Sequence, residues 1–298
     1  MMTLPNLFIL GAPKCGTTSL YRWLADHPQI VGSPMKETAY FADPGSHIYR
    51  PDRNVRNGLA PLAALYAKAD TAKLVRLEGT PSHIYSQTAL AHIPDLPGAP
   101  KCLFVLREPA AQIRSLFIYF QNSWSFLPDD LSFDAYVDRL TNGDQDWTAG
   151  GNELLVNALE NGRYVHWLRR WQARLGPDRM RVISFESLMG CPTDTLHAIA
   201  DWIGATPEFY HAYTFPEENR SYHIRNARVK RLAVRLRAHL PHGPLYTFAR
   251  ATYRRLNTFA PARSDDAAAV HRLRAGFVAA NQALSSEFGI RFSLGDPA

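Results

Sequence analysis

The residues best suited to chemistry lie close together near the start of the chain. Residues 11–18 read GAPKCGTT, with two glycines five positions apart, a lysine between them and hydroxyl side chains directly after the second glycine. A loop of small residues can point its backbone N–H groups at an oxyanion, and a helix that begins there adds the positive end of its dipole. The segment predicts a phosphate site formed by Lys14, Cys15, Gly16, Thr17, Thr18 and Ser19.

The position of the lysine distinguishes this loop from the P-loop of nucleoside triphosphatases. The pattern G-x-x-x-x-G-K-[ST] requires a lysine directly after the second glycine, where this chain has Thr17; its loop lysine, Lys14, comes earlier. In those enzymes the lysine reaches the terminal phosphates and the hydroxyl holds Mg²⁺. A lysine within the loop and successive hydroxyls suit a shorter anion, so we expect a site without metal.

A second cation is expected at the same edge of the fold. The apolar run at residues 102–106 ends in Arg107, at a point where a nucleoside triphosphatase can carry an aspartate for Mg²⁺. A guanidinium group would repel a metal ion and can bind a phosphate through two parallel hydrogen bonds. The sequence therefore predicts two neighbouring anion positions, one at the loop and one at Arg107.

Both positions resemble motifs of the sulfotransferase superfamily that uses 3′-phosphoadenosine 5′-phosphosulfate (PAPS). PKCGTTSL at residues 13–20 is similar to its 5′-phosphosulfate loop, and LREP at residues 106–109 with Ser115 is similar to its 3′-phosphate motif. Arg107 and Ser115 match that motif. Glu108 stands where the superfamily usually has Asn or Asp, and this side chain is not expected to hold the phosphate. The resemblance implies PAPS as co-substrate.

Further segments resemble the carbohydrate (heparan-sulfate-like) and bacterial branch of the superfamily. KETAYF at residues 36–41 is similar to its Lys-Glu-x-x-aromatic-Phe segment, and EGTPS at residues 78–82 is similar to its Glu-x-Thr/Ser-Pro segment. Shorter stretches also fit later positions, at residues 162–164, 185–188 and 281–284. Because the resemblance spans nearly the whole chain, we expect one sulfotransferase domain over residues 1–298.

The resemblance also implies catalytic roles. Lys14 is expected to follow the charge that builds on the bridging oxygen as the sulfuryl group departs. Glu37, which matches the catalytic glutamate of the carbohydrate branch, is expected to take the acceptor proton as general base. His83 is a second candidate, because other sulfotransferases use histidine and this one lies just past a Thr-Pro turn.

Positive charge is concentrated late in the chain. Residues 220–264 contain eleven Arg or Lys and no Asp or Glu, whereas the whole chain carries only +6. Members of the superfamily close the nucleotide site with a late basic loop; Arg225 is our candidate, with Arg220 and Arg228 beside it, although the usual glycine is missing. The rest of this block is either a solvated helix face or a contact to an anionic membrane or acidic glycan. We expect no nucleic-acid partner.

Short apolar runs must form the strands that position these residues. Such runs lie at residues 6–11, 74–77, 102–106 and 180–185, each followed by a plausible helix, the first of them over residues 17–26. This alternation predicts an α/β fold: a P-loop-type parallel β-sheet flanked by helices on both faces. A long irregular stretch at residues 43–61 is expected to be an acceptor-binding loop.

Composition agrees with a folded α/β protein. The chain has 298 residues, 46% of them apolar, which is enough for a sizeable core. Cys15, Cys102 and Cys191 show no metal-ligand spacing and are expected to be reduced thiols. The apolar run at residues 7–10 is too short to span a bilayer and lacks the flanks of a signal peptide, so we expect a cytoplasmic protein.

The function expected from these residues is transfer of the sulfuryl group of PAPS to a hydroxyl, or as a second choice an amine, of a glycan, lipid or small-molecule acceptor. A P-loop small-molecule kinase would need a magnesium site and a lysine beside Thr18, and the sequence offers neither. An inactive anion-binding module would suit the basic block but would not need Lys14, Glu37 and Arg107 together. The acceptor loops carry no recognisable code.

Overall fold

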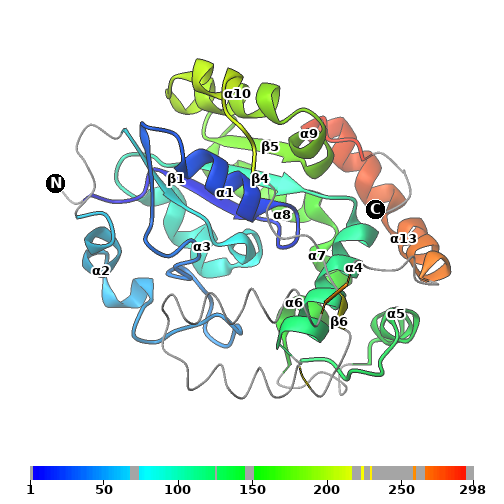
Figure 1. Cartoon of the computed structure of the whole chain (residues 1–298). Coiled ribbons are helices and arrows are strands. Elements are labelled where there is room, and N and C mark those ends of the chain that lie inside the picture. Colours follow the sequence, from blue (N-terminus) through cyan, green and yellow to red (C-terminus); the bar gives the residue numbers. More distant parts are fainter. Residues whose placement is uncertain are drawn as a thin grey trace.

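A computed structural model describes residues 3–67, 74–124, 126–144, 151–216, 223–224, 229, 258–259 and 266–292. Its centre is a sheet of five parallel strands in the order β2-β3-β1-β4-β5, covered by helices (Figure 1). The strands are β1 (Leu7–Gly11), β2 (Ile30–Gly32), β3 (Val75–Glu78), β4 (Lys101–Leu106) and β5 (Met180–Ser184). The predicted α/β fold is confirmed, with β2 as an additional strand.

The described helices alternate with these strands. They are α1 (Thr17–Ala25), α2 (Ala60–Ala64), α3 (Gln87–His92), α4 (Pro109–Tyr119), α5 (Phe133–Asn142), α6 (Glu153–Val156), α7 (Ala158–Asn161), α8 (Tyr164–Leu175), α9 (Phe185–Gly190), α10 (Pro192–Ile203) and α13 (Ala267–Phe288). Short 3₁₀ helices are η1 (Val55–Asn57), η2 (Pro81–Tyr85), η3 (Ile93–Asp95) and η5 (Pro207–His211), and η4 (Phe120–Trp124) is a π-helix. A small antiparallel pair joins β6 (His223–Ile224) to β7 (Thr258–Phe259).

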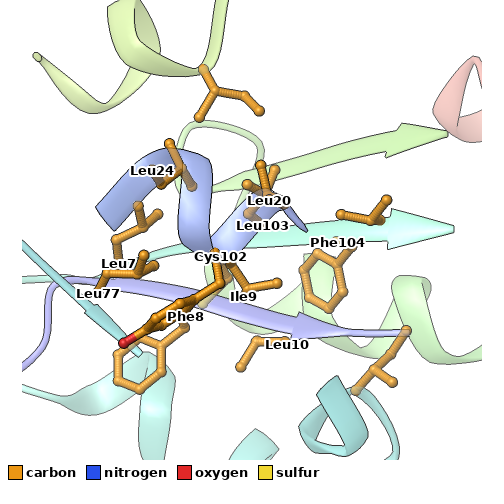
Figure 2. Close-up of a cluster of buried hydrophobic side chains, with 14 of the residues drawn as sticks. Leu7, Phe8, Ile9, Leu10, Leu20, Leu24, Leu77, Cys102, Leu103 and Phe104 are labelled. Atoms are coloured by element: carbon orange, nitrogen blue, oxygen red, sulfur yellow. The ribbon is translucent and has the colours of Figure 1, made fainter. Parts of the chain in front are cut away.

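The continuous apolar runs of β1 and β4 are explained by their place in the middle of the sheet. All five residues of β1 are buried, since β1 pairs with β3 on one side and β4 on the other. Successive side chains point to opposite faces. Figure 2 shows Leu20 and Leu24 of α1 above the strands, while Phe8 and Leu10 point to the other face.

A second cluster of buried side chains joins the C-terminal part of the chain to the middle. Phe277 of α13 packs against Gly162, where an added Cβ would lie 2.6 Å from the phenylalanine ring. Arg114 of α4 pairs with Asp266, 2.7 Å away, immediately before α13. The helix α13 therefore packs on elements that precede it by more than 100 residues in the sequence.

The cysteines agree with the sequence prediction. Cys15 and Cys102 are buried, Cys191 is exposed, and all three are free thiols. No helix in the described ranges is both long and apolar enough to cross a membrane.

Candidate active site

The predicted phosphate loop connects β1 directly to α1. Gly16 has φ +80° and is the N-cap residue of α1, and a Cβ there would meet the ring of Phe185 at 2.9 Å. A Cβ on Gly11 would lie 2.6 Å from Ile84. Both glycines of the motif are thus required by close packing. Lys14 also has a left-handed backbone, with φ 66°, a conformation that non-glycine residues adopt mainly at special sites.

The first turn of α4 holds this loop in place. The side-chain amide of Gln112 donates a hydrogen bond of 2.9 Å to the carbonyl of Pro13. The thiol of Cys15 donates to the same carbonyl and lies 4.0 Å from the hydroxyl of Tyr164. Burial raises the pKa of Cys15 to about 12. Cys15 is therefore a neutral packing residue, and its thiol is not suited to hold an anion.

Lys14 carries its charge in a crowded cationic environment. Its ammonium lies over the ring of Tyr119, 4.1 Å from the centroid. Burial, reinforced by the charge of Arg107, lowers the pKa of Lys14 to about 8, while the carboxylate of Glu37 opposes this shift. Lys14 follows β1 and Arg107 follows the adjacent strand β4, so an anion bound between the two cations would relieve their repulsion.

Arg107 lies directly after β4, with its guanidinium 4.7 Å from the centroid of the Phe185 ring. Ser115 is buried two turns into α4, the helix that begins just after Arg107. Because α4 starts at the carboxyl end of β4, its N-terminus lies at the same sheet edge as the N-terminus of α1 (Figure 1). The two anion positions predicted from the sequence therefore lie on adjacent strands.

Glu108, which departs from the superfamily pattern, caps α4. Its carboxylate accepts hydrogen bonds from the backbone N–H groups of Ala110 and Ala111 at 3.1 and 3.0 Å. Nε of Arg274, on α13, lies 3.5 Å from the same carboxylate. An Asn or Asp is a good N-cap for the same reason, so Glu108 preserves the capping role of that position.

Glu37 is half exposed and pairs with its neighbour. Nζ of Lys36 lies 2.8 Å from one carboxylate oxygen of Glu37, Oε1. The next residue is fixed more firmly, because the backbone N–H and hydroxyl of Thr38 both donate to Glu78, at 3.1 and 2.9 Å. The backbone carbonyl of Lys36 also accepts from the N–H of Gly79 at 3.2 Å. The segment with Glu37 is therefore attached to the end of β3.

Glu78 is an important residue whose role the EGTPS motif at residues 78–82 did not reveal. Its fully buried carboxylate accepts four hydrogen bonds, from the backbone N–H and hydroxyl groups of Thr38 and Thr80. Burial raises the pKa of Glu78, and these hydrogen bonds counteract the increase. The contacts join segments 40 residues apart, which explains why no local sequence pattern signals them.

His83 lies close to this buried carboxylate. Its Nδ1 is 3.8 Å from Glu78, but neither ring nitrogen has a hydrogen-bond partner among the described residues. Burial lowers the pKa of His83 to about 3, so the ring is neutral. It packs edge-on against Phe41, with centroids 5.9 Å apart. The role of His83 as an alternative base stays a prediction.

Some of the remaining predicted binding residues lie in the described part of the chain, and others lie outside it. Thr17 and Ser19 are buried in the first turn of α1, and Thr18 is partly exposed. Arg225 lies outside the described residues, as do Arg220, Arg228 and most of the basic block at 220–264. Within the described ranges, no group of three or more His, Cys, Asp or Glu side chains is arranged to hold a metal ion.

Comparison with protein families identifies the family to which the chain belongs. Residues 5–208 match the model described as the sulfotransferase family, and they include the phosphate loop, Glu37, Arg107 and Ser115. The match covers more than half of the chain. The protein therefore belongs to the sulfotransferase family.

Individual sulfotransferases similar to this chain share fewer than a third of its residues over the matched range. Heparan sulfate glucosamine 3-O-sulfotransferase 3B1 of Mus musculus is 28% identical over 201 residues, which cover 67% of this chain and 46% of that protein. Bifunctional heparan sulfate N-deacetylase/N-sulfotransferase 1 of Caenorhabditis elegans is 22% identical over 234 residues, covering 75% of this chain and 25% of that protein. The chain thus spans less than half the length of these two relatives.

A solved structure has the same fold. The sulfotransferase from Alicyclobacillus acidocaldarius superposes with a TM-score of 0.59 at 21% sequence identity, covering 78% of this chain and 92% of that chain. At this identity the similarity establishes the α/β architecture of the family and nothing finer.

Proposed function

We propose that this protein, as a single domain over residues 1–298, transfers the sulfuryl group of PAPS to a hydroxyl of an acceptor. The observation that carries the proposal is the placement of two cations at one edge of the sheet: Lys14 follows β1, and Arg107 follows the adjacent strand β4. PAPS carries phosphate at both ends of its ribose, so it can neutralise both. A nucleotide with only a 5′-phosphate would leave Arg107 without its anion.

The two phosphates of the donor would bind at different helices, the 5′-phosphate at the N-terminus of α1 and the 3′-phosphate near the N-terminus of α4. The backbone N–H groups of Cys15 to Ser19 would hold the 5′-phosphate, with the hydroxyls of the first turn of α1 beside them. Arg107 and Ser115 would bind the 3′-phosphate. Arg225 stays our candidate for closing the nucleotide site. All of these groups are uncharged or cationic, which supports donor binding without a metal.

Glu37 and Lys14 would carry the transfer itself. As the acceptor oxygen attacks sulfur in line, its proton passes to the carboxylate of Glu37 and a new oxygen–sulfur bond forms. The bond from sulfur to the bridging phosphate oxygen breaks, and that oxygen keeps the electron pair, leaving 3′,5′-adenosine bisphosphate (PAP). Lys14 would neutralise the negative charge on this oxygen. Lys36 contacts one oxygen of Glu37 and leaves the other for the proton.

The acceptor is proposed as a molecule with a hydroxyl group: a glycan, a lipid or a small metabolite, with an amine as second choice. The names of the relatives, which include heparan sulfate glucosamine 3-O-sulfotransferase and carbohydrate sulfotransferase 15, support a glycan among these classes. Cytoplasmic location and contact of the basic block at 220–264 with an anionic surface stay predictions.

The test separates sulfuryl transfer from the kinase and the inactive module. Purified protein is incubated with PAPS carrying labelled sulfate and a panel of acceptors, with and without excess chelator. We expect label transfer and release of PAP that chelator leaves unchanged. Mg²⁺-dependent phosphate transfer from ATP without label transfer from PAPS would favour the kinase, and PAP binding without turnover on any acceptor would favour the inactive module.

A further inference from the structure

A cavity of about 460 Å³ lies beside the candidate active site. We call it the side cavity, and its walls come from the loop after Phe41, from η2, from α6 and α7, and from one residue of α8. Its lining includes the polar or aromatic side chains of Asp43, Ser46, His83, Tyr85, Glu160 and Trp167. The predicted acceptor loop at residues 43–61 thus supplies one wall.

The side cavity shares a wall with the phosphate loop. Gly11, where β1 enters that loop, packs against Ile84 and the carbonyl of Pro81, both in η2. The neighbouring η2 residues His83 and Tyr85 line the cavity. Its other wall continues directly from the segment at residues 36–41 that contains Glu37. The side cavity is therefore separated from the donor loop by η2 alone, and one of its walls continues the segment that contains the proposed base.

Several polar groups of this wall are buried without a partner. The hydroxyls of Ser46 and Tyr85 and both ring nitrogens of His83 make no hydrogen bond within the described part of the chain. Unpaired buried polar groups are costly and uncommon in folded proteins, so a small shift of this wall that lets a ligand reach and pair them would be favourable. A hydroxyl group can both donate and accept a hydrogen bond, so a ligand with hydroxyl groups can pair with Ser46, Tyr85 and His83.

The charge of the wall is negative. Asp43, Glu153 and Glu160 are carboxylates, and the lining residues in the described ranges include no Lys or Arg. Asp43 is held by neutral donors, the hydroxyl of Ser86 and two backbone N–H groups.

The other two carboxylates have basic partners. Glu153 pairs with His47 at 2.8 Å. Glu160 contacts Arg163 and His166 at 2.9 and 3.0 Å. Hydrogen bonds and these neighbours lower the pKa values of Asp43, Glu153 and Glu160, so all three stay ionised. Arg163 offsets part of this charge, and Asp43, whose donors are all neutral, keeps its full negative charge.

We infer that the side cavity holds the non-reacting part of the acceptor, and that it selects a neutral or cationic hydroxyl compound over an anionic one. This rests on the proposed sulfuryl transfer and narrows its acceptor class. The rings of Tyr85 and Trp167, whose centroids are 5.3 Å apart, offer an apolar surface for a sugar or aromatic ring. A sulfate or carboxylate on the acceptor would face the three carboxylates and be repelled.

The first test uses three phenols of equal size that differ in charge: tyramine, tyrosol and 4-hydroxyphenylacetate. Sulfate transfer from PAPS and the thermal shift of the PAP complex are measured for each. We expect tyramine and tyrosol to exceed 4-hydroxyphenylacetate at least about tenfold in kcat/KM, the factor that corresponds to about one pKa unit of charge interaction. Equal or better use of the anion, or no binding of tyramine and tyrosol, would overturn the inference.

Two pairs of variants locate the effect. Asn157→Trp, which fills the exposed rim of the cavity, should raise the KM for tyrosol at least about tenfold, whereas Asn157→Ala should not. Glu160→Gln should reduce the preference for tyramine over 4-hydroxyphenylacetate, and the matched charge change Glu208→Gln, at an exposed site in η5, should leave it unchanged.

Titration with PAP distinguishes failure of the cavity inference from failure of the proposed sulfuryl transfer. Normal PAP affinity with unaltered acceptor kinetics in Asn157→Trp means that the acceptor lies elsewhere while the proposed transfer stands. A wild-type protein that does not bind PAP instead removes the proposed function itself.

Discussion

The ammonium of Lys14 lies 4.1 Å from the centre of the Tyr119 ring. An aromatic face attracts a cation without using the hydrogens of the ammonium, so Lys14 can still donate to an oxyanion. Lys14→Met keeps the length of the side chain and removes its charge. We expect turnover to fall about a hundredfold to a thousandfold, as for other groups that stabilise transition-state charge. Single-turnover rates at saturating PAPS measure this, and a rate within about threefold of wild type would contradict it.

The pH dependence of donor binding should report the charge of Lys14. Its pKa is lowered to about 8, so in the free enzyme the ammonium loses its proton as the pH rises through that value. PAP affinity of the wild type should therefore decline above about pH 8. Lys14→Arg, which stays charged, should show no such decline. Calorimetric titration of both proteins from pH 6.5 to 9.5 provides the comparison, and parallel curves would exclude Lys14 as the titrating group.

The same group has a measurable effect on stability, and its sign is opposite to that of a stabilising ion pair. The folded pKa of about 8 lies below the ordinary lysine value of 10.5, so between these values the unfolded chain binds more protons. Stability of the free protein should therefore increase with pH across this window. In Lys14→Met this contribution should disappear, which urea unfolding at pH 7.5 and pH 10 can measure.

Arg107 should decide between donors. Arg107→Ala removes the expected contact to the 3′-phosphate, a loss of about 2 to 4 kcal/mol for a charge-assisted pair. The affinity for PAP should fall, whereas that for 5′-AMP, which has no 3′-phosphate, should change little. Titration of both nucleotides into both proteins measures the difference. Equal discrimination by wild type and variant would place the 3′-phosphate elsewhere.

Glu37→Gln should keep donor affinity and reduce turnover about a hundredfold to ten-thousandfold, since the amide preserves shape but cannot take the acceptor proton. His83→Asn should act mainly on the KM for the acceptor, because the ring is buried in the wall of the side cavity. Steady-state kinetics of both variants separate the two effects. Near-normal turnover in Glu37→Gln with loss of turnover in His83→Asn would make His83 the base.

Glu78 should act as a positioning residue for the segment with Glu37. In Glu78→Gln the side-chain NH₂ must face a donor from Thr38 or Thr80, at a cost of about 1 to 3 kcal/mol in stability. We expect lower kcat with unchanged PAP affinity, together with a lower urea midpoint. Glu37→Gln is the matched control, because its half-exposed side chain should affect kcat without affecting stability. Normal kcat in a destabilised Glu78→Gln would leave Glu78 a purely structural role.

What could be predicted from the sequence was local. The phosphate loop and Arg107 were found because each follows an apolar run within a few residues, and β1 and β4 formed where those runs lie. The three-residue strand β2 was missed, since it is too short for a periodic pattern. The position of 43–61 as a loop was predicted, although it contains the short helix η1 and the start of α2.

The remaining features depend on contacts between distant segments. Glu78 reaches Thr38 across 40 residues, and the carboxylate of Glu108 meets Arg274 on α13. The side cavity is assembled from four separate segments, none of which has a distinctive pattern of its own. Physical pairing of this kind is set by the tertiary fold and leaves no periodic signal in a single sequence.

The close packing of Gly11 on Ile84 has a consequence for how donor and acceptor affect each other's affinity. Because η2 contacts the donor loop on one side and the side cavity on the other, a shift of η2 when either molecule binds changes the site of the other. The factor by which PAP changes acceptor affinity must equal the factor by which acceptor changes PAP affinity. Measuring the effect of PAP on acceptor affinity therefore also gives the effect of acceptor on PAP affinity. A factor different from one would make donor and acceptor binding cooperative.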